Sequence, residues 1–208
     1  MERARPDVIL VGGDIAWGPM PQATVAALRA LGDKAVFVRG NADREVAGRE
    51  IEGADASVAD VTAWCWERLS EDERAFLAGL PPVQVLTVEG LGPTVFCHGS
   101  PRSDEEAITA STPATDLEEM LSEVREPVVV CGHTHAQFDR ALGKRRVVNP
   151  GSLGLQRGER GAHWALLGPE VDLRITPYDV EQAASDIRAS GCPHAEEFAA
   201  HVLAPPLS

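Results

Sequence analysis

The fold of this chain is decided by residues 128–135, which read Val-Val-Val-Cys-Gly-His-Thr-His. A run of β-branched residues of this length predicts a buried strand, and here it ends at a glycine followed by two histidines. In open α/β sheets, ligands bind just beyond the carboxyl ends of such strands. We therefore expect His133 and His135 to lie at the edge of a sheet, where they can hold a ligand.

Four further apolar runs end in the same manner, each in a glycine-flanked residue of a type that binds metals. They are residues 8–11 before Gly12-Gly13-Asp14, 36–38 before Gly40-Asn41-Ala42-Asp43, 95–97 before His98-Gly99, and 147–148 before Asn149-Pro150-Gly151-Ser152. One such ending can be accidental, whereas five that carry Asp, Asn and His predict a metal site. The alternation of these strands with helical segments predicts an α/β fold with mixed sheets.

The intervening segments carry helix and hairpin signals. Helical periodicity predicts helices over residues 21–31, 46–80 and 179–190, with Ser70 and Glu73 forming a capping box in the second segment. Alternating patterns predict two hairpins, 83–88 with 94–97 and 164–167 with 171–176. Residues 46–80 can either overhang the site as a lid or form a plain connecting layer, and the pattern leaves both readings open.

Composition limits the class of protein and of partner. A chain of 208 residues with 44% hydrophobic and 25% charged residues suits one soluble domain over residues 1–208. A net charge of −13 without a basic stripe argues against a nucleic acid polymer, but leaves a small phosphate ester possible. Four cysteines without C-x-x-C spacing favour a reduced, cytoplasmic setting. No membrane partner is expected, and a homodimer is possible.

The candidate ligands define the chemistry of the site. The Asp14 carboxylate can bridge two cations, His98, His133 and His135 offer nitrogen, and Asn41 offers an amide oxygen. Such a set without thiolate suits Mn, Fe, Zn, Co or Ni, of which we favour Mn. Two cations about 3.5–4 Å apart clamp a phosphoryl group and lower the pKa of bound water to about 7, which supplies a metal-bound hydroxide as nucleophile. Asp43 is expected to orient a ligand or water.

These motifs resemble those of the calcineurin-like metallophosphoesterase superfamily, and within it the small bacterial and archaeal phosphodiesterases. The resemblance implies a four-layer αββα sandwich of two mixed sheets, with a dinuclear metal site between the ends of the sheets. It implies that Asp14 bridges two divalent ions. Asn41, His98 and His133 would complete the coordination of one ion, and His135 would bind the other. The activity it implies is phosphoester hydrolysis by a metallophosphoesterase.

Two departures from the family pattern refine these expectations. Many members carry a histidine general acid where this chain has Ala42, which favours diesters over monoesters as substrates. The family also opens with a strand ending in Asp-x-His, and this sequence contains no Asp-x-His. We expect that the first strand and helix are missing because the translation start is misplaced, since residues 2–5 read as the end of an amphipathic helix. The alternative is that Met1 is the true start.

Other interpretations stay open beside the phosphodiesterase. The chain can be a non-catalytic or mononuclear metal-binding protein that lacks one metal site. It can also be a phosphoprotein phosphatase or dinucleotide polyphosphatase, which Ala42 disfavours. Arg102 is a candidate phosphate contact, with a surface salt bridge as the plainer account. His163, His194 and His201 fall outside the constellation and are interpreted as ordinary surface or core residues.

Overall fold

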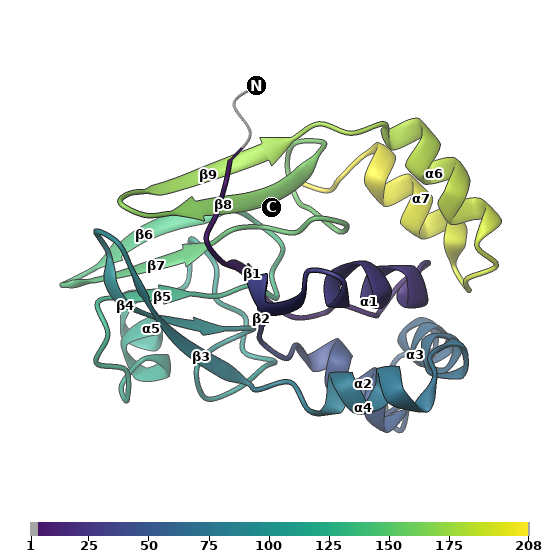
Figure 1. The fold of residues 1–208 in the computed structure, drawn as a ribbon, viewed down its shortest axis with the longest axis horizontal. Coiled ribbons are helices and arrows are strands. Elements are labelled where there is room, and N and C mark those ends of the chain that lie inside the picture. The colour runs from purple at the N-terminus through teal and green to yellow at the C-terminus, as the bar shows by residue number, and fades with distance from the viewer. Residues whose placement is uncertain (1–3, 208) are drawn as a thin grey trace.

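The computed structural model describes residues 4–207, which form nine strands and seven α-helices (Figure 1). The strands are β1 (Ile9–Val11), β2 (Ala35–Phe37), β3 (Val83–Val88), β4 (Gly92–Cys97), β5 (Val128–Val130), β6 (Phe138–Leu142), β7 (Arg145–Asn149), β8 (Ala162–Leu167) and β9 (Val171–Thr176). The helices are α1 (Pro21–Arg29), α2 (Asn41–Gly48), α3 (Ala56–Arg68), α4 (Glu71–Ala78), α5 (Ala114–Met120), α6 (Val180–Ala189) and α7 (Ala195–Leu203).

The larger sheet has five strands in the order β3-β4-β5-β7-β6. Its three inner strands are parallel, and the register aligns Val95 with Val129 and Val129 with Val147. Because parallel strands end at the same edge, the residues that follow β4 and β5 are brought together there. The outer strands β3 and β6 run antiparallel to their neighbours, so the sheet is mixed.

The second β layer consists of two pairs of strands. β1 and β2 pair in parallel, and β8 and β9 form an antiparallel hairpin. Within residues 4–207 these pairs are not joined into one hydrogen-bonded sheet. Both pack on the larger sheet, since Leu10 and Leu173 belong to the same apolar cluster as Val128, Val130 and Val148.

Helices cover the outer faces of both β layers. Leu117 and Leu121, in and just after α5, pack with Val129 and Val147 on the free face of the five-stranded sheet. The other six helices pack together against Val11 and Phe37 of β1 and β2 through buried residues such as Val25 and Val61. The α/β fold in four αββα layers is therefore confirmed, and residues 46–80 form a packed connecting layer. A single domain over residues 1–208 stays a prediction.

Local signals explain most of these elements. The predicted capping box of α4 is present, with Glu73 N donating to Ser70 Oγ (3.2 Å) and Ser70 N donating to Glu73 Oε2 (2.8 Å). The two predicted hairpins are confirmed as β3–β4 and β8–β9. Strand β6 was not predicted, because it is a short edge strand whose centre holds the charged residues Asp139 and Arg140.

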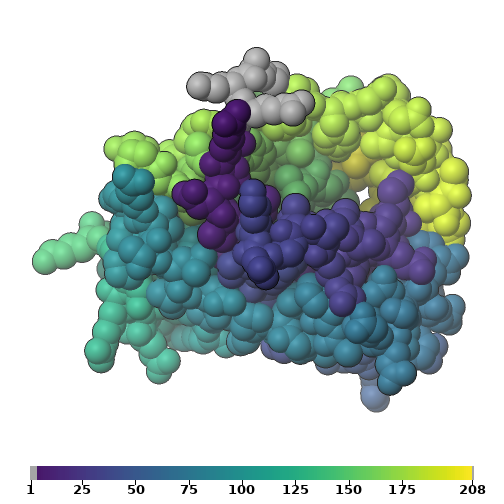
Figure 2. Space-filling model, in the orientation of Figure 1, coloured from purple at the N-terminus to yellow at the C-terminus, as the bar shows by residue number. Residues whose placement is uncertain are grey.

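Figure 2 shows purple N-terminal segments and yellow-green to yellow C-terminal segments on the same face of the molecule, and Val25 of α1 shares an apolar cluster with Phe198 of α7. The predicted misplacement of the translation start concerns Met1, which, like residues 2 and 3 of the predicted helix end, lies outside the described residues.

The remaining two residues of that predicted helix end, Ala4 and Arg5, are not helical. No helix in the part of the chain that the structure describes is long and apolar enough to cross a membrane.

Candidate metal centre

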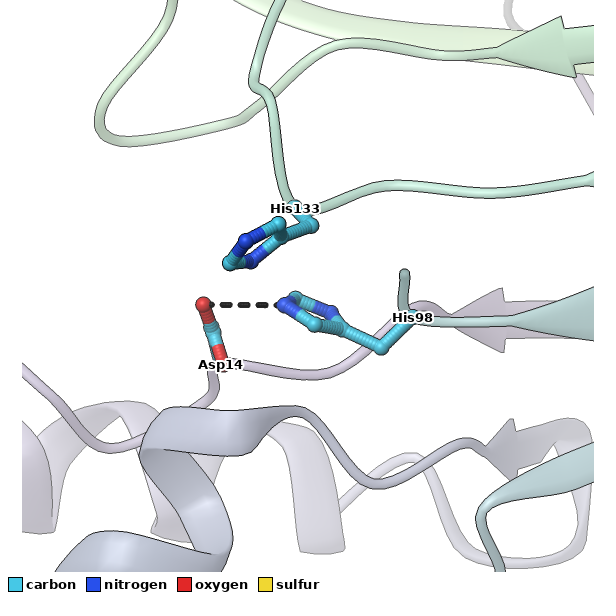
Figure 3. Close-up of side chains that lie close together, drawn as sticks. All are labelled: Asp14, His98 and His133. Atoms are coloured by element: carbon cyan, nitrogen blue, oxygen red, sulfur yellow. Dashed lines mark ion pairs between the residues drawn. The ribbon is translucent and has the colours of Figure 1, made fainter. Parts of the chain in front are cut away.

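Three of the predicted ligands meet in space: Asp14, His98 and His133 (Figure 3). Each lies in the chain segment that follows a strand, after β1, β4 and β5 respectively. One potential ligand atom from each lies within 4.8 Å of the other two. Asp14 Oδ2 is 3.1 Å from His98 Nε2, and the rings of His98 and His133 meet edge to face with centroids 5.2 Å apart. This spacing suits three donors around one cation.

The His98 ring is oriented so that its Nε2 atom is available to a ligand. Its Nδ1 lies 2.8 Å from the carbonyl oxygen of Gly12, which can only accept, so Nδ1 carries the proton. The Nε2 atom is buried and has no hydrogen-bond partner within residues 4–207, although Asp14 Oδ2 lies 3.1 Å from it as an ion-pair partner. Burial opposes protonation of His98, but the neighbouring Asp14 outweighs it and raises the pKa of His98.

Asn41 adds a second unsatisfied ligand atom. It is the first residue of α2, and its Nδ2 donates to Glu45 Oε1 at 3.1 Å. That bond leaves Oδ1 buried and, among the described residues, without a partner. An unsatisfied buried polar atom costs about 1–3 kcal/mol. Each of these atoms, Asn41 Oδ1 and His98 Nε2, is of a type that a cation would satisfy, so the residues present fit a metal ion.

The loop between β5 and β6 presents both histidines of the pair. His133 and His135 each have φ of 61°, in the left-handed region, and Asp14 has φ of 55°. Asp and His are among the few non-glycine residues found there with some frequency. Burial lowers the pKa of both His133 and His135, which keeps them neutral as metal ligands must be. His135 does not belong to the group of ligand atoms within 4.8 Å of one another.

Asp43 ties two loops of the site together. Its side chain is fully buried, with 0% exposure, and accepts hydrogen bonds from the backbone N–H groups of Asp14 (2.9 Å), Ile15 (2.7 Å) and Gly40 (2.9 Å). Burial and the charge of Asp14 raise the pKa of Asp43 to about 6. The carboxylate thus fixes the backbone that carries Asp14. That Asp43 orients a metal ligand or a water stays a prediction.

The flanking glycines allow these loops to approach each other. A Cβ atom at Gly40 would lie 2.1 Å from Asp14 Oδ1, and one at Gly13 would lie 2.5 Å from Gly40 N. Gly13 also has φ of 96°, which disfavours any other residue. The glycines beside Asp14 and Asn41 are therefore required for the close backbone contact between the two loops that carry these candidate ligands.

Asn149, which ends one of the five apolar runs in the sequence, is a positioning residue that holds the backbone around His133. It is fully buried at the end of β7, next to β5 in the sheet. Its Nδ2 donates to Gly132 O (2.7 Å) and Thr134 Oγ1 (3.0 Å), and its Oδ1 accepts from Gly151 N (2.9 Å). These bonds hold the backbone on both sides of His133. The signal available in the sequence was its place at the end of an apolar run.

Asn149→Ala is expected to loosen the His133 loop. The change removes three hydrogen bonds from a buried site, so we expect the free energy of unfolding to fall by about 1–3 kcal/mol. Metal affinity should fall about 10- to 100-fold, as is usual for residues that orient ligands. Chemical denaturation and metal titration measure the two effects. Asn149→Asp, which keeps the acceptor for Gly151 but loses both donated bonds, is the matched comparison. Unchanged metal affinity in both variants would exclude the positioning role.

Arg102, the predicted phosphate contact, lies in surface salt bridges. Its guanidinium is 2.7 Å from Glu106 Oε1 and 3.4 Å from Glu119 Oε1, and 45% of its side chain is exposed. The plainer account of Arg102 is thus observed, and a contact with phosphate stays a prediction.

Arg44, in α2, is also engaged by carboxylates. Its Nε lies 3.1 Å from Asp104 Oδ2 and its Nη2 lies 2.7 Å from Glu105 Oε1, with a further contact to Glu50. The charges of Asp104 and Glu105 act on His133. The carboxylates of Asp104 and Glu105 therefore act on this side of the site, and the positive charge of Arg44 is already paired with them.

Comparisons with known proteins agree with this architecture. A family model described as the calcineurin-like phosphoesterase superfamily domain matches residues 1–171. A hypothetical protein from Pyrococcus horikoshii is similar in structure, with a TM-score of 0.82 and 21% identity over 95% of this chain and 85% of its own. A metallophosphoesterase from Sphaerobacter thermophilus gives a TM-score of 0.75 and 24% identity, covering 96% of this chain and 89% of its own. These likenesses show the fold. No curated protein matches the sequence significantly.

Proposed function

The chain belongs to the calcineurin-like phosphoesterase superfamily, and on this premise we propose that it hydrolyses small phosphodiesters in a metal-dependent reaction. The family depends on divalent metal ions, and Asp14, His98 and His133 form a possible metal-binding group. The observation that carries the proposal is the pair of buried atoms, His98 Nε2 and Asn41 Oδ1, that have no hydrogen-bond partner in residues 4–207. Their desolvation is offset when a cation binds them.

Five residues would hold the metal. Asp14, Asn41, His98 and His133 would bind one ion, and Asp14 with His135 would bind the second. Their nitrogen and oxygen donors suit Mn, Fe, Zn, Co or Ni, with Mn favoured. When bound, such ions polarise phosphoryl oxygens and lower the pKa of a coordinated water to about 7.

The protein's own residues prepare the site for these ligands. Asp43 fixes the backbone of Asp14 through two neighbouring N–H groups, and Asn149 fixes the loop that carries His133. Burial keeps His133 and His135 neutral, so their nitrogen lone pairs are free to bind. The ligands are thus held in place by residues that do not themselves bind.

The charge around the site favours diesters over monoesters. Glu45 accepts a hydrogen bond from Asn41, and Asp104 and Glu105 act on His133, while Arg44 is already paired. A phosphate monoester carries about two negative charges at neutral pH and a diester carries one, so this acidic surrounding repels the monoester more strongly. The same repulsion disfavours a dinucleotide polyphosphate. Because position 42 is alanine, no side-chain acid is available there to protonate a poor leaving group, which also favours diesters with good leaving groups.

The test compares bis(4-nitrophenyl) phosphate with 4-nitrophenyl phosphate after loading with Mn²⁺. We expect metal-dependent hydrolysis that a chelator abolishes, with kcat/KM at least about tenfold higher for the diester, the equivalent of about 1.4 kcal/mol. Glu105→Gln should narrow this preference by removing one repelling charge, whereas Glu71→Gln, an exposed change in α4, should leave it as it is. Preference for the monoester, or hydrolysis that survives the chelator, would contradict the proposal.

A second candidate is a mononuclear or non-catalytic metal-binding protein. It is favoured by one observation, that the group within 4.8 Å contains Asp14, His98 and His133 but not His135. Metal content measured by mass spectrometry separates the two: about one ion per chain and no diester hydrolysis would support this candidate. Two further proposals are a cytoplasmic location, from the pattern of cysteines, and a homodimer formed through strand edges or the helices of residues 46–80.

A further inference from the structure

A pocket of about 210 Å³ lies between the loop after β1, the first turns of α3, and α7. Its apolar wall is made by Trp17, Val61, Leu155 and Phe198. The rings of Trp17 and Phe198 meet edge to face, with centroids 5.5 Å apart and an interplanar angle of 62°. The indole N–H of Trp17 is already donated to Thr62 Oγ1 at 3.1 Å. The pocket therefore meets the carbon surface of the indole rather than its N–H group.

The pocket lies beside the segments that carry the candidate metal centre. Trp17 follows Asp14 by three residues, and three extended residues span at most about 10 Å. On the other side, the backbone of Leu155 contacts the His135 side chain, and Arg157 N donates to His135 O at 3.2 Å. The segments that carry Asp14 and contact His135 thus also form the wall of the pocket.

The remaining lining is polar and lies among helix ends. Ser57 is exposed in the first turn of α3, His194 and Glu197 come from the start of α7, and His201 lies in the last turn of α7. His194 Nδ1 lies 3.4 Å from Glu197 Oε1. These side chains can hydrogen-bond to substituents on the edge of a ring whose faces lie against the apolar wall.

We propose that this pocket binds an uncharged aromatic ring, namely the ester group of a phosphodiester that stays on the phosphate during hydrolysis; the inference rests on the proposed function. Pockets for drug-sized ligands measure about 300–1,000 Å³, so a pocket of about 210 Å³ suits one ring and not a whole nucleotide. The pair of aromatic rings, Trp17 and Phe198, offers the edge and face contacts that aromatic groups prefer.

The test uses two diesters that share a 4-nitrophenyl leaving group, bis(4-nitrophenyl) phosphate and methyl 4-nitrophenyl phosphate. Ser57→Leu narrows the pocket without removing a buried contact, because Ser57 is exposed. We expect this variant to lower the ratio of kcat/KM for the bis-aryl ester over the methyl ester by about tenfold, mainly through KM. Ser185→Leu makes the same change at an exposed position of α6 and should keep the wild-type ratio.

Binding without chemistry is measured by titrating 4-nitroanisole, an aryl ether that carries no charge, and following tryptophan fluorescence. Saturable binding that Ser57→Leu weakens about tenfold supports the pocket, and its absence in the wild-type protein overturns it. A wild-type enzyme that hydrolyses both diesters with a ratio unaltered by Ser57→Leu also overturns it. Failure of the metal-loaded protein to hydrolyse either diester contradicts the proposed function instead, and the 4-nitroanisole titration then still decides whether the pocket binds an aromatic ring.

Discussion

Asp14→Asn is expected to abolish metal-dependent diester hydrolysis while the protein stays folded. The asparagine oxygen can keep the hydrogen bond that Asp14 Oδ1 accepts from Ala42 N at 3.0 Å. The other oxygen, which lies 3.1 Å from His98 Nε2, becomes an amide NH₂ group that cannot bind a cation. Loss of this donor and its charge should lower metal affinity and kcat/KM at least about 100-fold, since even residues that only orient ligands cost 10- to 100-fold.

Asparagine is the informative replacement because Asp14 has φ of 55°. Asparagine tolerates this region, whereas alanine would add backbone strain and give the loss of activity a second cause. The free energy of unfolding without metal should stay within about 1 kcal/mol of wild type. Metal content by mass spectrometry and thermal unfolding check both statements, with the exposed Asp33→Asn as matched control. Full metal occupancy in Asp14→Asn would remove Asp14 from the ligand set.

The convergence of Asp14, His98 and His133 could be predicted because each follows a short apolar strand. Parallel strands end at one edge, so the order of strands in the sequence implies a meeting point for His98 and His133. The packing of β1 on the larger sheet then brings Asp14 beside them. The sequence pattern does not record the direction in which each side chain points. It therefore could not predict that His135 lies outside the group formed by Asp14, His98 and His133.

Other features depend on contacts between residues far apart in the sequence. Asn149 is bound to Gly132 and Thr134 only because β7 pairs with β5. His194 was interpreted as an ordinary residue, yet it lines the pocket with Trp17, which is separated from it by most of the chain. No local periodicity records such proximity, since it arises from the packing of α7 against the loop after β1.

Asp43→Asn is expected to lower the free energy of unfolding by about 1–3 kcal/mol, although Asp43 is not among the residues that would bind the metal. Asp43 Oδ2 accepts from the N–H groups of Asp14 and Gly40, and Oδ1 accepts from Ile15 N. An asparagine oxygen can replace one of these acceptors, and its NH₂ group then faces a buried N–H donor. An unsatisfied buried donor costs about 1–3 kcal/mol. Part of this loss of stability is offset, because asparagine has no negative charge to bury. The cost of burying that charge in the wild-type protein is what raises the pKa of Asp43 to about 6.

The same variant should weaken metal binding about 10- to 100-fold, because the backbone of Asp14 is no longer fixed. Asp14→Asn and Asp43→Asn thus separate two roles at positions that are in direct contact. The first should lose metal at nearly unchanged stability, and the second should lose stability and metal affinity together. Denaturant unfolding and metal titration of both variants, beside Asp33→Asn, measure the difference. If Asp43→Asn keeps wild-type stability and metal affinity, the three backbone hydrogen bonds do not hold the site together.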